Sequence, residues 1–282
     1  MSTAPNVTVN DPHAAGHADV VPERDASDRL ARVHGAMELH ATLLALLLPA
    51  GSKRALRAWQ IETEAMSGVD VLRQHAASLS GAARLPWFEK LLARMGTQPL
   101  VARQDLLKAA RRVMGSRGTA RPIDRLHWLA MRRGCGEIAP LAARPEANVE
   151  VAEWLESDVL DVATYTAFLS RMVPGDEADS PQGEAWYTAV MTTWAPFSEP
   201  PPWQPPPAAG MVEALNHLQT LSWMQRPGVV RNWVITAIRM SRGEQLADLS
   251  ADALRLTCGL LDSPQPPELL RHYVTLADDG PP

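Results

Sequence analysis

Residues 113–124 read VMGSRGTARPID, and residues 240–243 read MSRG, so that the same Ser-Arg-Gly turn occurs twice, at Arg117 and at Arg242. Each copy interrupts two segments with apolar periodicity. Glycine tolerates the left-handed backbone conformation that ends a helix, and the polar residues after it allow the chain to reverse. The doubled turn therefore predicts pairs of amphipathic helices that bury their apolar stripes together.

Almost every other segment also carries the helical period rather than strict alternation. One stripe runs through Leu106, Leu107, Ala110, Val113 and Met114, with the spacing i, i+1, i+4, i+7 and i+8 that is typical of one helix face. No segment predicts a convincing strand. We therefore expect an all-α fold.

Helix boundaries are predicted from capping residues. Ser52 is expected to cap a helix that ends before Gly68, and Pro86 is expected in the first turn of the next apolar helix. Ser250 or Asp252 is expected to cap the last long helix.

Around both turns a short helix, a longer helix and a third helix follow in the same order. The predicted ranges are 86–95, 100–115 and 122–133 in the first copy, and 211–222, 227–241 and 249–262 in the second. We interpret these as two loosely repeated helical units. The expected organisation is an N-terminal disordered tail, a basic helical unit, an acidic helical connector, a Pro-rich spacer and a second helical unit, at residues 1–27, 28–145, 146–197, 198–210 and 211–282.

The spacer SEPPPWQPPPAAG, residues 198–210, is too rich in proline for a helix and favours an extended form. We expect Trp203 in its middle to fold back on a helix. The alternative is that the spacer is a ligand for a domain with an aromatic groove. Residues 173–185 are predicted to form a second, mobile loop.

The charge of the chain is unevenly distributed. The net charge of −5 divides into +7 for residues 1–145, with 20 basic and 13 acidic residues, and −12 for residues 146–282, with 7 and 19. Such blocks suggest either that the two halves dock on each other or that the basic half meets an acidic partner.

The chain is expected to be cytoplasmic. Its two cysteines, Cys135 and Cys258, are far apart and lie in helical patterns, which favours small core residues in a reducing compartment. The longest apolar run, HATLLALLLPA at residues 40–50, is about half the length of the roughly 20 residues that span a bilayer. The N-terminus lacks the pattern of a secretion signal. We do not expect an integral membrane protein.

No pattern of catalytic or cofactor-binding residues is present. The only close group of possible metal ligands is HGAMELH at residues 34–40, and its two histidines lack the i, i+4 spacing of a zinc-peptidase helix. Neither cysteine has zinc or redox spacing, and no nucleophile elbow, phosphate loop or dinucleotide pattern occurs. We therefore expect no catalytic residues, no metal and no cofactor, and we do not expect an enzyme.

One cluster of basic residues surrounds the first turn and could meet phosphate groups: Arg111, Arg112, Arg117, Arg121 and Arg125. Within residues 84–133, twelve basic residues face only three acids. However, no DNA-binding or RNA-binding motif is recognisable, and we do not expect a nucleic-acid partner. The alternative interpretation is a solvated face that the acidic second half neutralises.

Four stretches, taken in order, carry a resemblance to a known family: LARVHGAMELHATLLALLLPAGSKRALRAWQ, RLPWFEKLLARM, DLLKAARRVMGSRGTARPIDRLHWLAMRR and ADALRLTCGLLDSPQPPELLRHY. They resemble the helical C-terminal portion of bacterial membrane-anchored zinc metallopeptidases related to HtpX and the CAAX prenyl proteases. That portion is similar to the tellurite-resistance TerB-like fold. The resemblance implies a non-catalytic helical appendage, because the peptidase's His-Glu-x-x-His helix has no counterpart in this sequence.

The resemblance also bears on the turns. The family's turn commonly reads Ala-Asp-Gly followed by an acid, whereas Arg117 and Arg242 stand where the aspartate is expected. Asp124 matches the later acid in the first copy, and Asp252 or Ser250 stands near it in the second. Guanidinium groups at these positions would repel a cation, so the resemblance transfers no metal site to these turns.

Three hypotheses for function follow. The first is a helical scaffold or protein-interaction module, with an unidentified protein partner, that is derived from or cooperates with a membrane zinc peptidase. The second assigns to the chain the peptidase activity of the full-length family. The third is binding of nucleic acid or anionic surfaces through residues 84–133.

Overall fold

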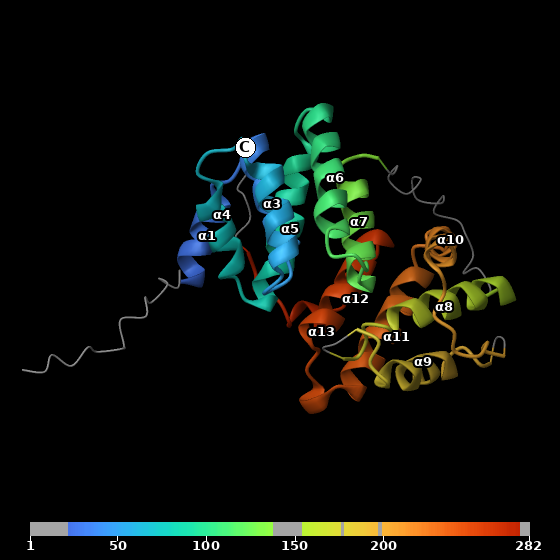
Figure 1. Ribbon diagram of the computed structural model, residues 1–282. Coiled ribbons are helices and arrows are strands. Elements are labelled where there is room, and N and C mark those ends of the chain that lie inside the picture. The colour runs from blue at the N-terminus through green and yellow to red at the C-terminus, as the bar shows by residue number, and fades with distance from the viewer. Residues whose placement is uncertain (1–21, 138–153, 176–177, 197–198, 277–282) are drawn as a thin grey trace, which may run out of the picture.

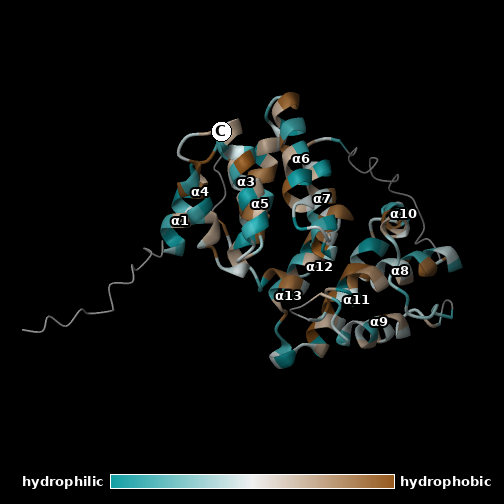
Figure 2. Ribbon diagram, in the orientation of Figure 1, coloured by the Kyte–Doolittle hydropathy of each residue, from teal (hydrophilic) through white to brown (hydrophobic). Residues whose placement is uncertain are grey.

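The computed structural model describes residues 22–137, 154–175, 178–196 and 199–276. Over these residues the chain forms thirteen α-helices, one short 3₁₀ turn and no strand, which confirms the all-α prediction (Figure 1). Figure 2 shows that helices such as α6 and α7 carry both hydrophobic and hydrophilic residues along their length, as expected for amphipathic helices. The helices of the first half are α1 Glu23–Ala31, α2 Ala36–Leu46, α3 Lys53–Thr63, α4 Val69–Ala77, α5 Gly81–Gly96, α6 Leu100–Gly115 and α7 Pro122–Gly134. Those of the second half are α8 Glu156–Leu169, α9 Gln182–Thr192, α10 Ala208–Leu218, α11 Gln225–Met240, η1 Arg242–Glu244, α12 Asp248–Leu260 and α13 Pro267–Leu270.

Helix α2 forms the centre of the first half. Its sequence is apolar on nearly every side, and every residue from Ala41 to Leu46 is buried. A helix without a polar face must be covered on all sides, and α3, α4, α5 and α6 all pack against it. Trp59 of α3 donates its indole N–H to the carbonyl oxygen of Ala41 at 2.9 Å, so that its buried polar atom is satisfied.

Helix α8 has the same role in the second half. It packs against α9 and α10, while α11 packs against α9 and α12. Two buried hydrogen bonds connect these helices. The Trp233 indole N–H donates to the Thr166 hydroxyl at 2.8 Å, and the hydroxyls of Tyr165 and Thr257 lie 3.1 Å apart. Helices α8 and α9, which were predicted to be a connector, therefore belong to the core of the second half.

Helix α12 joins the two halves, because it packs against α5 and α7 as well as against α11 and α13. Arg133 at the end of α7 donates to the carbonyl oxygens of Gly259 and Leu260 at 2.6 and 2.9 Å. Arg255 of α12 pairs with Glu89 of α5. The two halves thus dock on each other, as one of the two interpretations of the charge blocks expected.

Both Ser-Arg-Gly turns contain the left-handed glycine that was predicted. Gly118 has φ +88° and Gly243 has φ +67°. The two arginines differ, because Arg117 is held by Asp124 whereas Arg242 is exposed. The packing of the two copies also differs: α5 packs on α2 and α7, whereas α10 packs mainly on α8. The helix order agrees with the proposed repeat, but the repeat itself stays a prediction.

Two of the predicted helix starts are wrong. Pro86 is the sixth residue of α5 rather than part of its first turn. Proline has no N–H to donate to Ala82, four residues earlier, and the Ala82 carbonyl accepts instead from the N–H of Val274 at 3.2 Å. Figure 1 shows the C-terminal segment returning to the side of the molecule where α5 lies. Ser250 and Asp252 lie inside α12, which begins at Asp248, so neither caps it.

Several predicted boundaries also differ from the structure. Residues 1–21 and the expected division between Pro145 and Glu146 lie outside the described residues, but Glu23–Ser27 of the predicted tail are helical. Helix α10 begins at Ala208, inside the predicted spacer, while residues 199–207 are not helical. Helix α9 begins at Gln182, inside the predicted loop 173–185. Trp203 is anchored, because its indole N–H donates to the Ser170 hydroxyl at 2.8 Å.

Among the described helices, none combines the length and the apolar character that crossing a membrane requires.

Candidate functional site

An interhelical cavity of about 650 Å³ lies among α2, α3, α4, α5, α7 and α12. A volume in this range suits a small organic ligand. One wall is apolar and is formed mainly by Leu46, Leu47, Leu48, Leu56, Leu85, Phe88, Ile123 and Leu249. The polar side chains that line the cavity are Ser52, Lys53, Arg73, Arg84, Arg121, His127 and Asp252. They come from elements far apart in the sequence, so the site exists only in the folded chain.

Arg84 of α5 lines this cavity and is held by backbone carbonyls. Its Nε donates to the Leu46 carbonyl at 3.0 Å, and its Nη2 donates to the carbonyls of Ala45 and Leu48 at 3.1 and 2.9 Å. The last carbonyls of a helix have no partner within the helix, so that Arg84 caps the C-terminus of α2. Burial lowers the pKa of Arg84, while the nearby Asp252 carboxylate opposes this effect. The guanidinium still stays charged at neutral pH.

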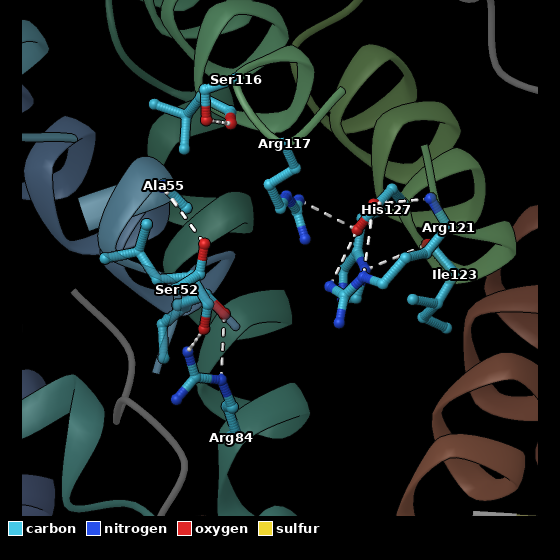
Figure 3. Close-up of polar contacts among 12 residues, drawn as sticks. Ser52, Ala55, Arg84, Ser116, Arg117, Arg121, Ile123 and His127 are labelled. Atoms are coloured by element: carbon cyan, nitrogen blue, oxygen red, sulfur yellow. Dashed lines mark hydrogen bonds and ion pairs between the residues drawn. The ribbon is translucent and has the colours of Figure 1, made fainter. Parts of the chain in front are cut away.

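Two arginines share one buried carboxylate beside the cavity. Oδ1 of Asp124 lies 3.1 Å from Nη2 of Arg117 and 3.0 Å from Nη2 of Arg121. Oδ2 of Asp124 accepts the backbone N–H of Arg121 at 3.0 Å and so caps α7. The Asp124 side chain is 5% exposed, and that of Arg117 is 10% exposed. Figure 3 shows this group of contacts on the α7 side.

Arg117 is only partly satisfied by this pair. Its Nε and Nη1 are buried and have no hydrogen-bond partner within the described chain. Burial of an unpaired polar nitrogen costs about 1–3 kcal/mol, and more for a charged group. Burial accordingly lowers the pKa of Arg117, while Asp124 opposes this effect. The buried Arg117 and the more exposed Arg121 together exceed by one charge the single carboxylate that they share.

His127 presents a neutral ring to the cavity. Its Nδ1 lies 3.1 Å from the Ile123 carbonyl, which requires the proton to be on Nδ1 and leaves Nε2 as an acceptor. The ring meets Phe88 edge-on at a centroid distance of 5.1 Å. Burial lowers the pKa of His127 to about 4, with Arg84 and Arg121 adding to the effect. The imidazole is uncharged at neutral pH.

Asp252 of α12 is the acid among the residues that line the cavity. Its Oδ1 accepts the Tyr273 hydroxyl at 3.0 Å. Burial raises the pKa of Asp252 to about 7, and Asp248 and Glu89 add to the rise, whereas the Tyr273 hydrogen bond and Arg255 oppose it. Asp252 is therefore only partly ionised at neutral pH, and it neutralises less than one positive charge.

The five arginines that were named as possible contacts for an anionic partner do not form one free surface. Arg112 pairs with Glu62, with Nη2 and Oε2 2.6 Å apart, and Arg111 stands over the Trp128 ring at 6.0 Å. Arg117 and Arg121 share Asp124, as described above. Arg125 is partly exposed on α7. Of the five, only Arg121 lines the interhelical cavity. The ion pairs of Arg112, Arg117 and Arg121 use acids of the first half rather than of the acidic second half.

The remaining reactive side chains are separate from the cavity. Cys135 and Cys258 are buried core residues, as predicted. Burial raises the pKa of Cys135 to about 11 and that of Cys258 to about 12, so both are thiols at neutral pH. Burial lowers the pKa of His40. Within the described ranges, no group of three or more His, Cys, Asp or Glu side chains is close enough to hold a metal ion.

Sequence patterns do not indicate that Lys53, Arg73, Arg84 and His127 belong to one site. A signal for Arg84 exists, because it precedes Phe88, Leu91 and Met95 by four, seven and eleven residues and so lies on the apolar face of α5. A charged residue on the apolar face of a helix indicates a side chain that is buried and has a specific role there. No local signal connects it with Lys53 or His127, since these residues meet only through tertiary packing.

Comparison of the chain with protein-family models, with curated proteins and with solved structures finds no match.

Proposed function

We propose that the protein is a non-catalytic helical scaffold whose recognition site is the interhelical cavity. The observation that carries this proposal is the cavity itself: about 650 Å³ lined by an apolar wall and by four cationic side chains, Lys53, Arg73, Arg84 and Arg121. Binding sites for small molecules commonly combine a concave apolar surface with a few convergent polar groups.

Most polar groups of the cavity are arranged to hold a ligand. Arg84 is fixed by carbonyls at and just after the end of α2, and Arg121 is fixed by Asp124. His127, with a pKa of about 4, is a poor proton acceptor at neutral pH, because a general base is most effective with a pKa near the working pH. Asp252, with a pKa of about 7, could exchange a proton, but its Oδ1 already accepts the Tyr273 hydroxyl. These features support a binding role.

Three further parts of this proposal rest on the sequence alone. They are the link to a membrane zinc peptidase, the cytoplasmic location and the presence of a protein partner. Occupation of the cavity would provide a means of regulating such a partner, because α12 lines the cavity and also joins the two halves of the chain.

The proposal is tested by screening a library of small fragments, both neutral and charged, by ligand-observed NMR against three proteins. These are the wild type, Ala77→Trp and Ala185→Trp. Ala77 is an exposed residue at the cavity rim, so a tryptophan there would fill the cavity without disturbing the core. Ala185 is an exposed residue of α9 and serves as the control.

We expect fragments that bind to the wild type and to Ala185→Trp, and that lose binding in Ala77→Trp. The proposal is wrong if no fragment binds to the wild type, or if all binding persists in Ala77→Trp.

A further inference from the structure

The cavity and its border carry an excess of positive charge. Lys53, Arg73, Arg84 and Arg121 line the cavity together with one acid, Asp252, and Arg117 and Asp124 adjoin it. Asp70 pairs with Arg73, with its Oδ1 4.0 Å from Nε. Five cationic groups therefore face three carboxyl groups, a formal excess of +2. The C-terminal dipole of α2, equivalent to about half a negative charge, offsets part of the Arg84 charge. An excess of about one and a half positive charges remains.

Arg117 shows where this excess is least well neutralised. Its side chain is nine-tenths buried, and its Nε and Nη1 have no partner within the described residues. Arg117 is not part of the cavity lining itself, but Figure 3 shows its guanidinium in the space between Ser52 on one side and Arg121 and His127 on the other. A buried charge without a full set of partners is costly. Nε and Nη1 of Arg117 are closed off from solvent, so an anion in the cavity would offset this charge through space rather than through hydrogen bonds to these two atoms.

The N-terminus of α3 faces the same cavity through Ser52 and Lys53. The Ser52 hydroxyl accepts the N–H of Ala55 at 3.3 Å, which satisfies one of the N–H groups of the first turn. The others have no partner within the helix, so the positive end of the helix dipole adds to the charge of Lys53. Anions, and phosphate groups in particular, bind at such positions.

From these observations we infer that the cavity binds a phosphate monoester, with its phosphate between Arg121 and the start of α3, in the field of the nearby Arg117, and its apolar body against Phe88 and Leu85. The inference rests on the proposed function and names its ligand class. A phosphate monoester carries about −1.5 to −2 charges at pH 7, which matches the excess more closely than the single charge of a carboxylate. Arginine also provides paired N–H donors that suit phosphate oxygens.

The inference is tested by titration calorimetry at low salt with phenyl phosphate, a phosphate monoester with a small apolar body. Benzoate has a similar ring and one charge, benzyl alcohol has the ring without charge, and inorganic phosphate has the charge without the ring. We expect phenyl phosphate to bind at least tenfold more tightly than each of the other three. Its affinity is expected to fall with added salt, since the contact is ionic.

Substitutions of charged residues in and near the cavity test where the phosphate group binds. Arg121→Gln is expected to weaken phenyl phosphate binding at least tenfold, and Lys53→Gln at least threefold. Lys53 is exposed, so its replacement does not threaten the fold. Arg125→Gln, which changes a partly exposed arginine of the same helix outside the cavity lining, is the control and is expected to stay within twofold of the wild type.

Arg117→Met separates a binding role from a structural one. If Arg117 stabilised the fold, its loss would lower the melting temperature. We expect the ligand-free variant to melt at or above the temperature of the wild type, because Asp124 keeps Arg121 as its partner while a partly unpartnered buried charge is removed. We expect it to lose part of the stabilisation by phenyl phosphate, because Arg117 adds to the positive field of the cavity.

The possible results separate the two proposals. Absence of phenyl phosphate binding, or equal binding by Arg121→Gln, Lys53→Gln and the wild type, overturns the phosphate inference. If neutral fragments still bind in a manner that Ala77→Trp blocks, the proposed function stands while the phosphate inference falls. If neither kind of compound binds, both fall.

Discussion

Arg255 of α12 and Glu89 of α5 form an ion pair across the two halves of the chain, with Nη2 2.7 Å from Oε2. The acidic half contributes the arginine and the basic half contributes the glutamate, which is the reverse of their net charges. Arg255 also stands over the Tyr273 ring, 4.4 Å from its centroid. The two halves are therefore held together at α5 and α12 by a specific ion pair, in addition to any attraction between their opposite net charges.

This pair is expected to contribute more to stability than a surface pair. Removing one partner leaves the other poorly solvated, because the Arg255 and Glu89 side chains are 13% and 32% exposed. A double-mutant cycle with Arg255→Met and Glu89→Gln is expected to give a coupling free energy of about 1–3 kcal/mol in urea unfolding. The same cycle on the exposed pair Asp105–Lys108 is expected to give about 0.5 kcal/mol or less. Equal couplings would contradict this account of the interface.

Asp252 is expected to make stability depend on pH. The pKa of Asp252 is raised to about 7 in the folded protein, mainly by burial, whereas its ordinary value is 3.8. The folded state therefore keeps a proton that the unfolded state releases. The resulting stabilisation is fully present below pH about 4 and is lost as the pH rises to about 7.

The measurement is the free energy of unfolding of wild type and Asp252→Asn at several pH values. Relative to Asp252→Asn, the wild type is expected to lose up to about 4 kcal/mol between pH 4 and pH 8, since each pKa unit corresponds to about 1.4 kcal/mol. Asp28→Asn, at an exposed position of α1, provides the control and is expected to follow the wild type. A constant difference between wild type and Asp252→Asn across this range would show that Asp252 titrates normally.

Gly183 is expected to be essential for the contact between α8 and α9. A Cβ atom at this position would overlap the Ser170 carbonyl oxygen, and a backbone atom cannot move aside cheaply. Gly183→Ala is expected to cost at least about 2 kcal/mol. Gly228→Ala is the matched control, because a Cβ there in α11 meets nothing within 4 Å, and it is expected to stabilise by about 0.5–1 kcal/mol. The measurement is thermal unfolding of both variants. If Gly183→Ala does not lower the stability, α8 and α9 are farther apart than described.

Arg84 is expected to support the fold as well as to line the cavity. It donates to four backbone carbonyls, those of Ala45, Leu46 and Leu48 near the end of α2 and that of Ala76 in α4. Arg84→Met would leave these acceptors without their donor, at a cost of about 3 kcal/mol or more. Arg57→Met, at an exposed position of α3, should change the free energy of unfolding by less than about 0.5 kcal/mol. Comparable effects of the two substitutions would be inconsistent with a capping role for Arg84.

Local features of the fold could be predicted from the sequence because their causes are local. The Ser52 hydroxyl does cap α3, as its position before an amphipathic pattern indicated. The glycines of both Ser-Arg-Gly turns adopt positive φ, since these positions end helices. Pro86 was misplaced because the partner that compensates for its missing N–H is Val274, which is distant in the sequence. That contact cannot be predicted from the residues near Pro86 in the sequence.

The candidate site could be predicted only in fragments. The basic cluster near the first turn was recognised, but its members point to different partners: Arg112 to Glu62, Arg111 to Trp128, and Arg117 and Arg121 to Asp124. Asp252 was expected to cap a helix, whereas it lies inside α12 and accepts the Tyr273 hydroxyl. The cavity depends on how six helices pack, and helical periodicity specifies which faces are apolar but not which faces meet.

The central claim is that a phosphate ester occupies the cavity, and a crystal structure of the protein with 4-iodophenyl phosphate tests it most directly, because iodine scatters anomalously and marks the apolar end of the ligand. The account predicts the phosphate within hydrogen-bond distance of Arg121 and the start of α3 and the iodine peak against the wall that contains Leu85 and Phe88. An empty cavity at saturating ligand concentration, or a ligand bound only on the outer surface near Arg111 and Trp128, would contradict it.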